Sequence, residues 1–272
     1  MTAVAFDPYA PHVPASRVRF LYGLNPLAKL FAPLPVIVLL VFARDAATPA
    51  AFILAAYALL LVGVRFTARL AGILLLAIPL AAVVLGAGFA VWTDAALVSG
   101  TPVAWRIGGW TMYTGALAIG AGTGLRLAAI LSLTLVAGLS TTGPDLVRAS
   151  VQQLRVPYRI GYTALAAFRF VPRFGHELDV IRQAHRVRGS HGGRGPFSAL
   201  ARWFGYIVPL LAGAIRHAER VALAMDARAF GAHPARTERH LVPWRARDTM
   251  FVLLFWGFST AVLIVLFPWG LA

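Results

Sequence analysis

Apolar residues fall into five long runs along the chain, separated by short polar segments. The runs lie at about residues 27–43, 48–64, 70–92, 113–138 and 249–267. Each has close to the roughly 17 to 25 residues that a helix needs to cross a bilayer. Only the segment ARDAA separates the first two runs, which therefore predict a helical hairpin. The pattern predicts an all-α, multi-pass membrane protein with about five transmembrane helices.

Two features inside the apolar runs could argue against membrane helices. Pro33, Pro35 and Pro79 lie within them, but neighbouring helices can satisfy the backbone groups that a proline leaves free. The segment GALAIGAGTG at 115–124 carries closely spaced glycines, with no strand before it and no acidic residue after it to bind a ribose. We interpret these glycines as a site of close helix packing, not as a nucleotide-binding loop.

The segment between the fourth and fifth runs has apolar residues at helical spacing. A short helix is expected at 144–154, with Thr142 as its N-cap and Asp145 in its first turn. Two long helices are expected at 158–188 and 197–229, because each follows a proline and each ends in a stretch rich in glycine and proline.

Both long helices contain an internal proline, Pro172 in the first and Pro209 in the second. A proline removes one backbone hydrogen bond and bends a helix, so we predict a kink in each. Small residues on both helices would let them cross at short distance; they are Ala164, Ala166, Ala167, Ala212, Gly213 and Ala214. We expect this crossing to bring both helix C-termini to one exposed surface.

Composition supports the membrane assignment and narrows the chemistry. Hydrophobic residues make up 59% of the 272 positions and charged residues only 13%, which is far from the average of soluble domains. The chain has no cysteine, so disulfides, thiol chemistry and cysteine zinc sites are excluded. The N-terminus is mixed and contains prolines, so we expect no cleaved signal peptide.

The distribution of charge predicts the orientation. Residues 139–248 hold 17 of the 25 basic residues and 7 of the 10 acidic ones. Basic side chains also occur at the start of the first run (Arg17, Arg19 and Lys29) and between the second and third runs (Arg65 and Arg69). In the alternate loops the charges nearly cancel, with Arg44 beside Asp45 in one and Asp94 with Arg106 in the other. Because cytoplasmic loops carry the basic excess, we predict a cytoplasmic N-terminus, a cytoplasmic helical segment and an external C-terminus. The predicted divisions are a membrane domain at 1–138, a cytoplasmic domain at 139–248 and a last span at 249–272.

Arg188 and Arg228 stand at the expected ends of the two long helices, each beside small residues. A cation there offsets the partial negative charge of the last carbonyl groups. Its guanidinium can still bind a carboxylate of a partner. Capping and the positive-inside rule would explain one such arginine. Two arginines in the same context favour a contact with a partner protein.

At these residues the chain resembles the transmembrane T component of energy-coupling factor transporters, which are importers of the ABC superfamily. The motifs that carry the resemblance are LNPLAKL at 24–30, FRFVPRF at 168–174, the signatures Val187-Arg188-Gly189 and Ala227-Arg228-Ala229, and GAHPARTERH at 231–240. Each signature departs by one small residue from the Ala-Arg-Gly of the family. The resemblance covers nearly the whole chain.

The resemblance implies a non-catalytic, five-span scaffold that transmits motion from ATPases to a substrate binder. Its two long coupling helices would seat one tip in each of two ATPase subunits, so the six signature residues would form the ATPase contact. A small membrane S component would bind the cargo, a vitamin, a vitamin precursor or a metal ion, and Arg126 is a candidate contact for it. ATP would bind the partner subunits, with no cofactor or metal held by this chain. The implied location is the cytoplasmic membrane of a prokaryote.

Other functions fit the sequence less well. No G-x-x-x-x-G-K-[ST] loop is present and the only lysine, Lys29, has no glycine loop before it, so this chain is not expected to be the ATPase. The scattered arginines do not suggest a nucleic-acid site. A membrane enzyme could use His176, Glu177 and Asp179, or His185 with His191. The first group lies in the middle of a helix and lacks a third ligand at metal spacing, so a solvated helix face explains it better. A stand-alone permease stays open, as does a structural role for Arg126.

Overall fold

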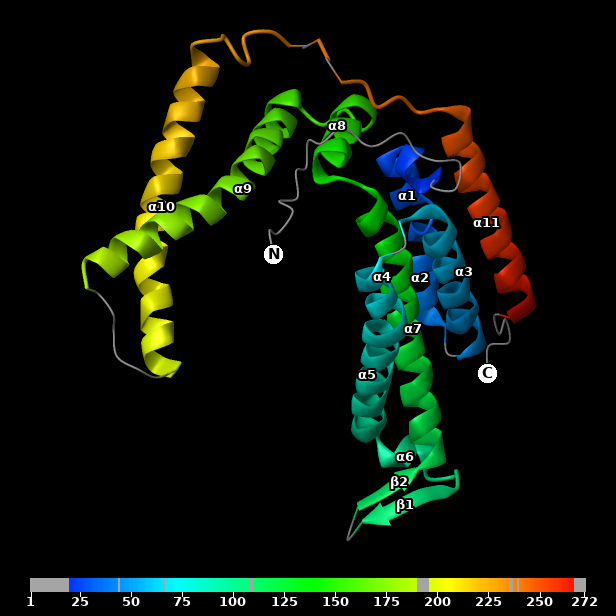
Figure 1. Ribbon diagram of the computed structural model, residues 1–272. Helices are drawn as coiled ribbons and strands as arrows, with labels where there is room; N and C mark the ends of the chain where they lie inside the picture. The colour runs from blue at the N-terminus through cyan, green and yellow to red at the C-terminus, as the bar shows by residue number, and fades with distance from the viewer. Residues whose placement is uncertain are drawn as a thin grey trace. The chain divides into compact units, whose positions relative to one another are not determined.

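The computed structural model describes residues 20–43, 45–65, 67–107, 110–189, 196–234, 237–238 and 240–266. It divides into two compact units (Figure 1). The membrane unit comprises the described residues before Gly143 and those from Pro243 on, and the coupling unit is Gly143–Val242. Arg17, Arg19, Arg44 and His191 lie outside the described residues.

The membrane unit is built from helices and one small hairpin. In chain order its elements are η1 (Phe20–Gly23), α1 (Pro26–Phe31), α2 (Leu34–Phe42), α3 (Ala47–Gly63), α4 (Ala68–Gly72), η2 (Ile73–Ala77), α5 (Ile78–Trp92), α6 (Ala95–Val98), β1 (Val103–Ile107), β2 (Trp110–Tyr113), α7 (Thr114–Ser140) and α11 (Ala246–Leu266). Within the described residues, three helices are long and apolar enough to cross a membrane, namely Ala68–Trp92, α7 and α11.

The first two predicted spans are shorter than the others. The apolar segments Pro26–Phe42 and Ala47–Gly63 fall below the length of the three long helices. The expected continuous helix at 27–43 is also interrupted, because a turn at Ala32 and Pro33 separates α1 from α2. Pro33 is the N-cap of α2, a position at which the missing N–H costs little. The run therefore consists of two short helices within one apolar segment, Pro26–Phe42.

Pro79 lies within a continuous helix, as expected for a membrane segment. The five residues of η2, immediately before α5, form a π-helical turn, and Pro79 is in the first turn of α5. A proline has no N–H and so leaves one carbonyl group in the preceding turn without its usual donor. A π turn next to the proline shifts the hydrogen-bond pattern at that point while the helix continues. The chain therefore continues from Ala68 to Trp92 without a separate loop.

An antiparallel hairpin, which the sequence analysis did not predict, connects α6 to α7. Strands β1 and β2 pair with Trp105 opposite Met112 and Ile107 opposite Trp110, and the ladder is irregular between Val103 and Trp105. The sequence between the strands is Gly-Gly, which is typical of a two-residue hairpin turn. The described fold is all-α apart from this hairpin.

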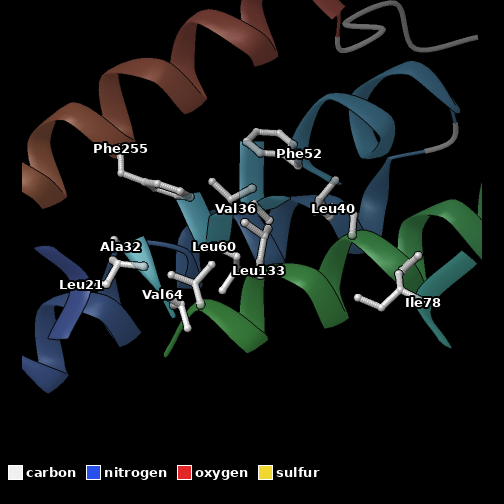
Figure 2. Packing of buried hydrophobic residues seen from close by; sticks show 14 of the residues in the cluster. Leu21, Ala32, Val36, Leu40, Phe52, Leu60, Val64, Ile78, Leu133 and Phe255 are labelled. Carbon is white, nitrogen blue, oxygen red and sulfur yellow. The ribbon is translucent and has the colours of Figure 1, made fainter. Parts of the chain in front are cut away.

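The core of the membrane unit lies around α7 (Figure 2). In the most apolar 18-residue stretch of α7, 44% of the residues are buried, whereas the corresponding shares are 22% in Ala68–Trp92 and 17% in α11. Helix α7 is therefore central, and the other two long helices present more apolar surface outward. Leu133 of α7 packs in one cluster with residues of the N-terminal helices and of α11, including Leu21, Val36, Phe52, Leu60 and Phe255.

Glycines bring α5 and α7 into close contact, as the segment 115–124 predicted. A Cβ atom added at Gly124 would lie 2.2 Å from the carbonyl oxygen of Ala82, and one added at Gly120 would lie 2.3 Å from that of Gly86. Distances below 3.0 Å to backbone atoms leave no room for a side chain. The two helices therefore pack backbone against backbone, which small residues permit in membranes.

The coupling unit contains the three helices expected there. Helix α8 is Gly143–Gln153, α9 is Tyr158–Val187 and α10 is Pro196–Asp226. Asp145 lies in the first turn of α8 and pairs with Arg148 at 2.9 Å. Pro172 and Pro209 lie inside α9 and α10, and both helices continue through them.

Candidate functional site

The two signatures have the same local geometry at the C-termini of α9 and α10. Arg188 caps α9, with its backbone N–H bonded to the Ala184 carbonyl at 3.1 Å. At the end of α10, the Phe230 N–H donates to the Met225 carbonyl at 3.0 Å, and the Ala229 N–H donates to the Asp226 carbonyl at 2.9 Å. These two bonds form a Schellman motif whose C-cap residue is Arg228. Each signature therefore places its arginine at a helix C-cap.

The residue after each arginine has a left-handed backbone. Gly189 has φ 69° and Ala229 has φ 54°. We call the end of α9 at Arg188 the first tip and the end of α10 at Arg228 the second tip. The Gly189 N–H bonds to the Arg186 carbonyl at 3.2 Å, which matches the bond that the Ala229 N–H makes at the second tip. Glycine adopts this conformation freely, whereas a residue with a Cβ atom is strained there by about 1–2 kcal/mol. The third signature position thus has a physical reason to be glycine, and the second tip departs from it.

We expect Ala229→Gly to stabilise the coupling unit by about 1 kcal/mol, because it removes the strain at a left-handed C′ position. The matched change Gly189→Ala should destabilise the first tip by a similar amount. Hydrogen exchange of the last-turn amides in α9 and α10 measures both effects locally. Equal protection in Ala229→Gly and in the unmodified chain would contradict this reading of the second tip.

Helices α9 and α10 cross each other and run in opposite directions (Figure 1). The rings of Phe170 and His217 stack with their centroids 4.2 Å apart, and those of His185 and Tyr206 meet edge to face at 5.3 Å. A Cβ atom added at Gly213 would lie 2.9 Å from Glu177 Oε1, so this small residue does lie at the crossing. Later residues of α9 thus meet earlier residues of α10.

The two tips are consequently at opposite ends of the crossed pair. Both tip arginines are exposed, and the expectation that the crossing brings both C-termini to one exposed surface stays a prediction. Each helix has about 30 residues, or roughly 45 Å at 1.5 Å per residue, and an antiparallel arrangement separates their C-termini by much of that length. Arg188 and Arg228 therefore offer two separate contact points.

The first turns of α9 hold the second tip. The Tyr158 hydroxyl donates to the His233 carbonyl at 2.5 Å, and the Arg159 guanidinium donates to the Gly231 carbonyl. The Phe230 ring packs edge to face against Tyr158 and Tyr162, with centroids 5.8 and 6.4 Å apart. These contacts fix the segment that follows Arg228.

The chain after the second tip returns along α8 and α9. The Tyr162 hydroxyl donates to Glu238 Oε2 at 2.6 Å. Gln152 of α8 donates to the His240 carbonyl at 2.9 Å and accepts from the Val242 N–H at 2.8 Å. The described part of GAHPARTERH is therefore a structured connection; Ala235, Arg236 and Arg239 lie outside the described residues.

A cationic cavity of about 820 Å³ lies beside the second tip, between α9, α10 and the described residues of the segment 230–240 that follows α10. Four arginines and several aromatic rings line it, including Arg148, Arg169, Arg173, Arg228, Tyr158, Tyr162, Phe170 and Phe230; among the described lining residues, Glu238 is the one acidic side chain. This excess of guanidinium groups favours an acidic partner.

The first tip is more open among the described residues. The Val187 side chain is 90% exposed, and Arg188 and Gly189 are also exposed. A Cβ atom added at Gly189 would meet no heavy atom within 4 Å. The two tips thus share a backbone geometry but differ in their surroundings.

Arg126 lies in the membrane unit, away from both signatures in sequence. Its guanidinium reaches the Val41 carbonyl in the last turn of α2, at 3.5 Å. The last carbonyls of a helix lack partners within the helix, and an arginine near them is favourable. This contact gives Arg126 a structural role, and a contact with an S component stays a prediction. Its buried Nε has no hydrogen-bond partner among the described residues.

The histidine and acidic residues that were considered for a membrane enzyme form no metal site in the described part of the chain, where no group of three or more histidine or acidic side chains could hold a metal ion. His185 instead packs on Tyr206, and Asp179 pairs with Arg182 at 3.3 Å on an exposed face. Sequence reasoning missed Tyr158, Arg159 and Tyr162 as supports of the second tip. Their signal was weak, because their partners lie more than 70 positions away.

Comparison with known proteins gives a family match and several relatives. The family model described as CbiQ, cobalt transport protein, matches residues 17–239. An energy-coupling factor transporter transmembrane protein of Thermotoga maritima is 33% identical over 148 residues, which cover 51% of this chain and 55% of the relative. Proteins of the same name from Bacillus subtilis and Staphylococcus aureus are 27% and 31% identical, covering 56% and 52% of this chain and 60% and 56% of their own lengths. The match spans little more than half the length of each relative.

Proposed function

Because the chain belongs to the CbiQ family of cobalt transport proteins, we propose that it is the transmembrane scaffold of an importer of the energy-coupling factor type. In this role it hydrolyses no ATP. It transmits the movement of two ATPase subunits to a separate S component that binds the cargo, a vitamin, a vitamin precursor or a metal ion. The relatives named as energy-coupling factor transmembrane proteins support this assignment.

The observation that carries the proposal is the pair of arginine tips with matching backbone geometry. Arg188 and Arg228 each cap a helix of about 30 residues, and each precedes a left-handed residue. A helix terminus with an exposed guanidinium suits insertion into an acidic groove. Two such tips at opposite ends of a crossed pair suit two ATPase subunits, one at each end.

The surroundings of the tips support two unequal contacts. Arg228 lines the cationic cavity together with Arg148, Arg169 and Arg173, so its ATPase subunit would place acidic residues there as well. Within the described residues, Val187 and Arg188 offer an exposed helix end. The second tip is therefore expected to make the larger contact.

An apolar stripe on α10 is the surface that best fits the S component. Large apolar side chains at helical spacing are exposed on this helix, namely Phe204, Val208, Leu211 and Ile215. Exposed apolar patches of this kind mark contacts with another protein or with lipid. We assign the S component to this stripe in preference to Arg126, because Arg126 already contacts the Val41 carbonyl.

The proposed orientation places the coupling unit in the cytoplasm and the β1–β2 hairpin outside a prokaryotic cytoplasmic membrane. The arginine excess in residues 139–248 supports it through the positive-inside rule. ATP would be bound by the partner subunits. A stand-alone permease is less favoured, because Arg126 is the only charged residue in the interior of the described long helices Ala68–Trp92 and α7 beyond their first turns.

Co-purification tests the proposed function. The tagged chain, expressed at native level in its own cells and extracted in mild detergent, should retain proteins that carry an ABC ATPase phosphate-binding loop, together with a small membrane protein. Mass spectrometry of the purified complex identifies them. Recovery of the chain alone, from cells in which those ATPases are present, would favour the stand-alone permease.

A further inference from the structure

The segment LNPLAKL contains the only lysine of the chain, and neither tip explains its presence. Lys29 lies in α1 and is 1% exposed. Its ammonium group donates to the Leu21 carbonyl at 3.2 Å and to the Ser140 carbonyl at 2.6 Å. A buried ammonium is costly unless its donors are satisfied. Lys29 therefore ties the N-terminal turn to a residue 111 positions later.

Ser140 is the last residue of α7, just before the coupling unit begins at Gly143. Its carbonyl has no acceptor role left within the helix, because the last four carbonyls of a helix lack intrahelical donors. A cation at this end also offsets the helix dipole. Lys29 thus fixes the point at which the chain leaves the membrane unit.

The same turn also holds the point at which the chain returns. The Asn25 N–H donates to Asp248 Oδ1 at 2.7 Å, and Asp248 Oδ2 accepts from the Arg245 N–H at 2.7 Å. Asn25 further donates to the Pro243 carbonyl at 3.4 Å. Pro243 is the first residue after the coupling unit, and Asp248 is 1% exposed in the first turn of α11.

We propose that this N-terminal segment, residues 21–29, is a clamp that fixes two membrane-unit residues close to the coupling unit in sequence, Ser140 before it and Pro243 after it, with Lys29 and Asp248 as its positioning residues. Without the clamp, the two connecting segments at 140–143 and 242–246 could bend when α9 and α10 move, and the membrane unit would not be displaced. With the clamp, that movement must be passed to the membrane unit. This inference rests on the proposed function for its purpose, but the clamp itself can be tested without any partner.

The first test measures the clamp in the isolated chain. Nitroxide labels at Val180→Cys on α9 and Leu54→Cys on α3 report the distance between the two units, and the chain has no native cysteine to interfere. Both positions are exposed. Lys29→Met keeps a long side chain and removes the ammonium group, so the measured distance distribution should broaden. Asp248→Asn should broaden it as well, because the carboxamide that replaces the carboxylate has only one acceptor oxygen.

The matched control is Ser140→Ala. The Ser140 hydroxyl donates to the Val136 carbonyl of its own helix, whereas Lys29 uses the Ser140 backbone carbonyl. Ser140→Ala should therefore leave the distribution unchanged. Distributions as narrow in Lys29→Met and Asp248→Asn as in the control would overturn the clamp. If Lys29→Met does not insert, Asp248→Asn decides alone.

The second test uses the complex with its ATPases. In the unmodified complex, ATP should shift the distance between the two labels. In Lys29→Met the ATPases should still co-purify and hydrolyse ATP, while the ATP-dependent shift is lost. Parallel loss of assembly and hydrolysis would show that Lys29 supports folding only. Failure of the unmodified chain to retain ATPases would count against the proposed function and not against the clamp.

Discussion

Arg188→Glu and Arg228→Glu are each expected to weaken binding of an ATPase subunit by at least about thirtyfold, which corresponds to about 2 kcal/mol. Truncation of a charge that is paired across an interface strands its partner, and reversal adds repulsion between like charges. Membrane insertion should be unchanged, because both side chains are exposed and cap helices outside the membrane unit. Co-purification at moderate salt measures the loss.

Two other arginines provide controls with the same charge change. Arg182 lies on an exposed face of α9, paired with Asp179, and Arg220 is exposed on α10. Arg182→Glu and Arg220→Glu should retain both ATPases, since an exposed pair contributes little. We expect Arg228→Glu to be the more severe of the two tip variants, because the cationic cavity adds to its contact. Full recovery of the ATPases with the double tip reversal would reject the assigned contact.

Gly124→Leu is expected to disrupt the membrane unit, at a cost of about 3 kcal/mol or more. The Cβ atom alone would lie 2.2 Å from the Ala82 carbonyl oxygen and 3.0 Å from the Gly86 Cα atom. These are backbone atoms of α5, so relief requires the two helices to separate. Thermal unfolding of the purified protein in detergent should show the loss directly.

Gly138 is the matched control in the same helix. A Cβ atom added there meets no heavy atom within 4 Å, and alanine forms helices better than glycine by about 1 kcal/mol. Gly138→Ala should therefore be neutral or slightly stabilising. Equal midpoints for Gly124→Leu and Gly138→Ala would contradict the close packing of α5 on α7.

Local sequence signals predicted the helices of the coupling unit well. Pro157 and Pro196 mark where α9 and α10 begin, and the left-handed Gly189 lies where α9 ends. The glycines of 115–124 predicted the close contact with α5 because only small residues allow it. These signals need no knowledge of distant partners, since backbone conformation and helix propensity are local.

The errors and omissions concern features that depend on distant residues or on weak signals. The turn at Pro33 divides a run that composition alone reads as continuous. The hairpin had a signal in the Gly-Gly sequence between its two strands and in the aromatic residues of the strands, which the surrounding apolar pattern obscured. The crossing of α9 and α10 in opposite directions and the partner of Lys29 could not be predicted, because hydropathy does not specify which helices meet or which carbonyl, 111 residues away, a lysine will bind.

Cross-linking from a single cysteine at the first tip tests the central claim most directly. Val187→Cys places a thiol on a side chain that is 90% exposed beside Arg188, and Leu97→Cys on α6, which is 79% exposed, is the matched control. In cells, a short cross-linker that carries a maleimide for the thiol and a photoreactive benzophenone that inserts into C–H bonds should join Val187→Cys to an ATPase subunit, and an impermeant maleimide should label Leu97→Cys alone. An ATPase adduct from Leu97→Cys, or external labelling of Val187→Cys without any ATPase adduct, would contradict the account.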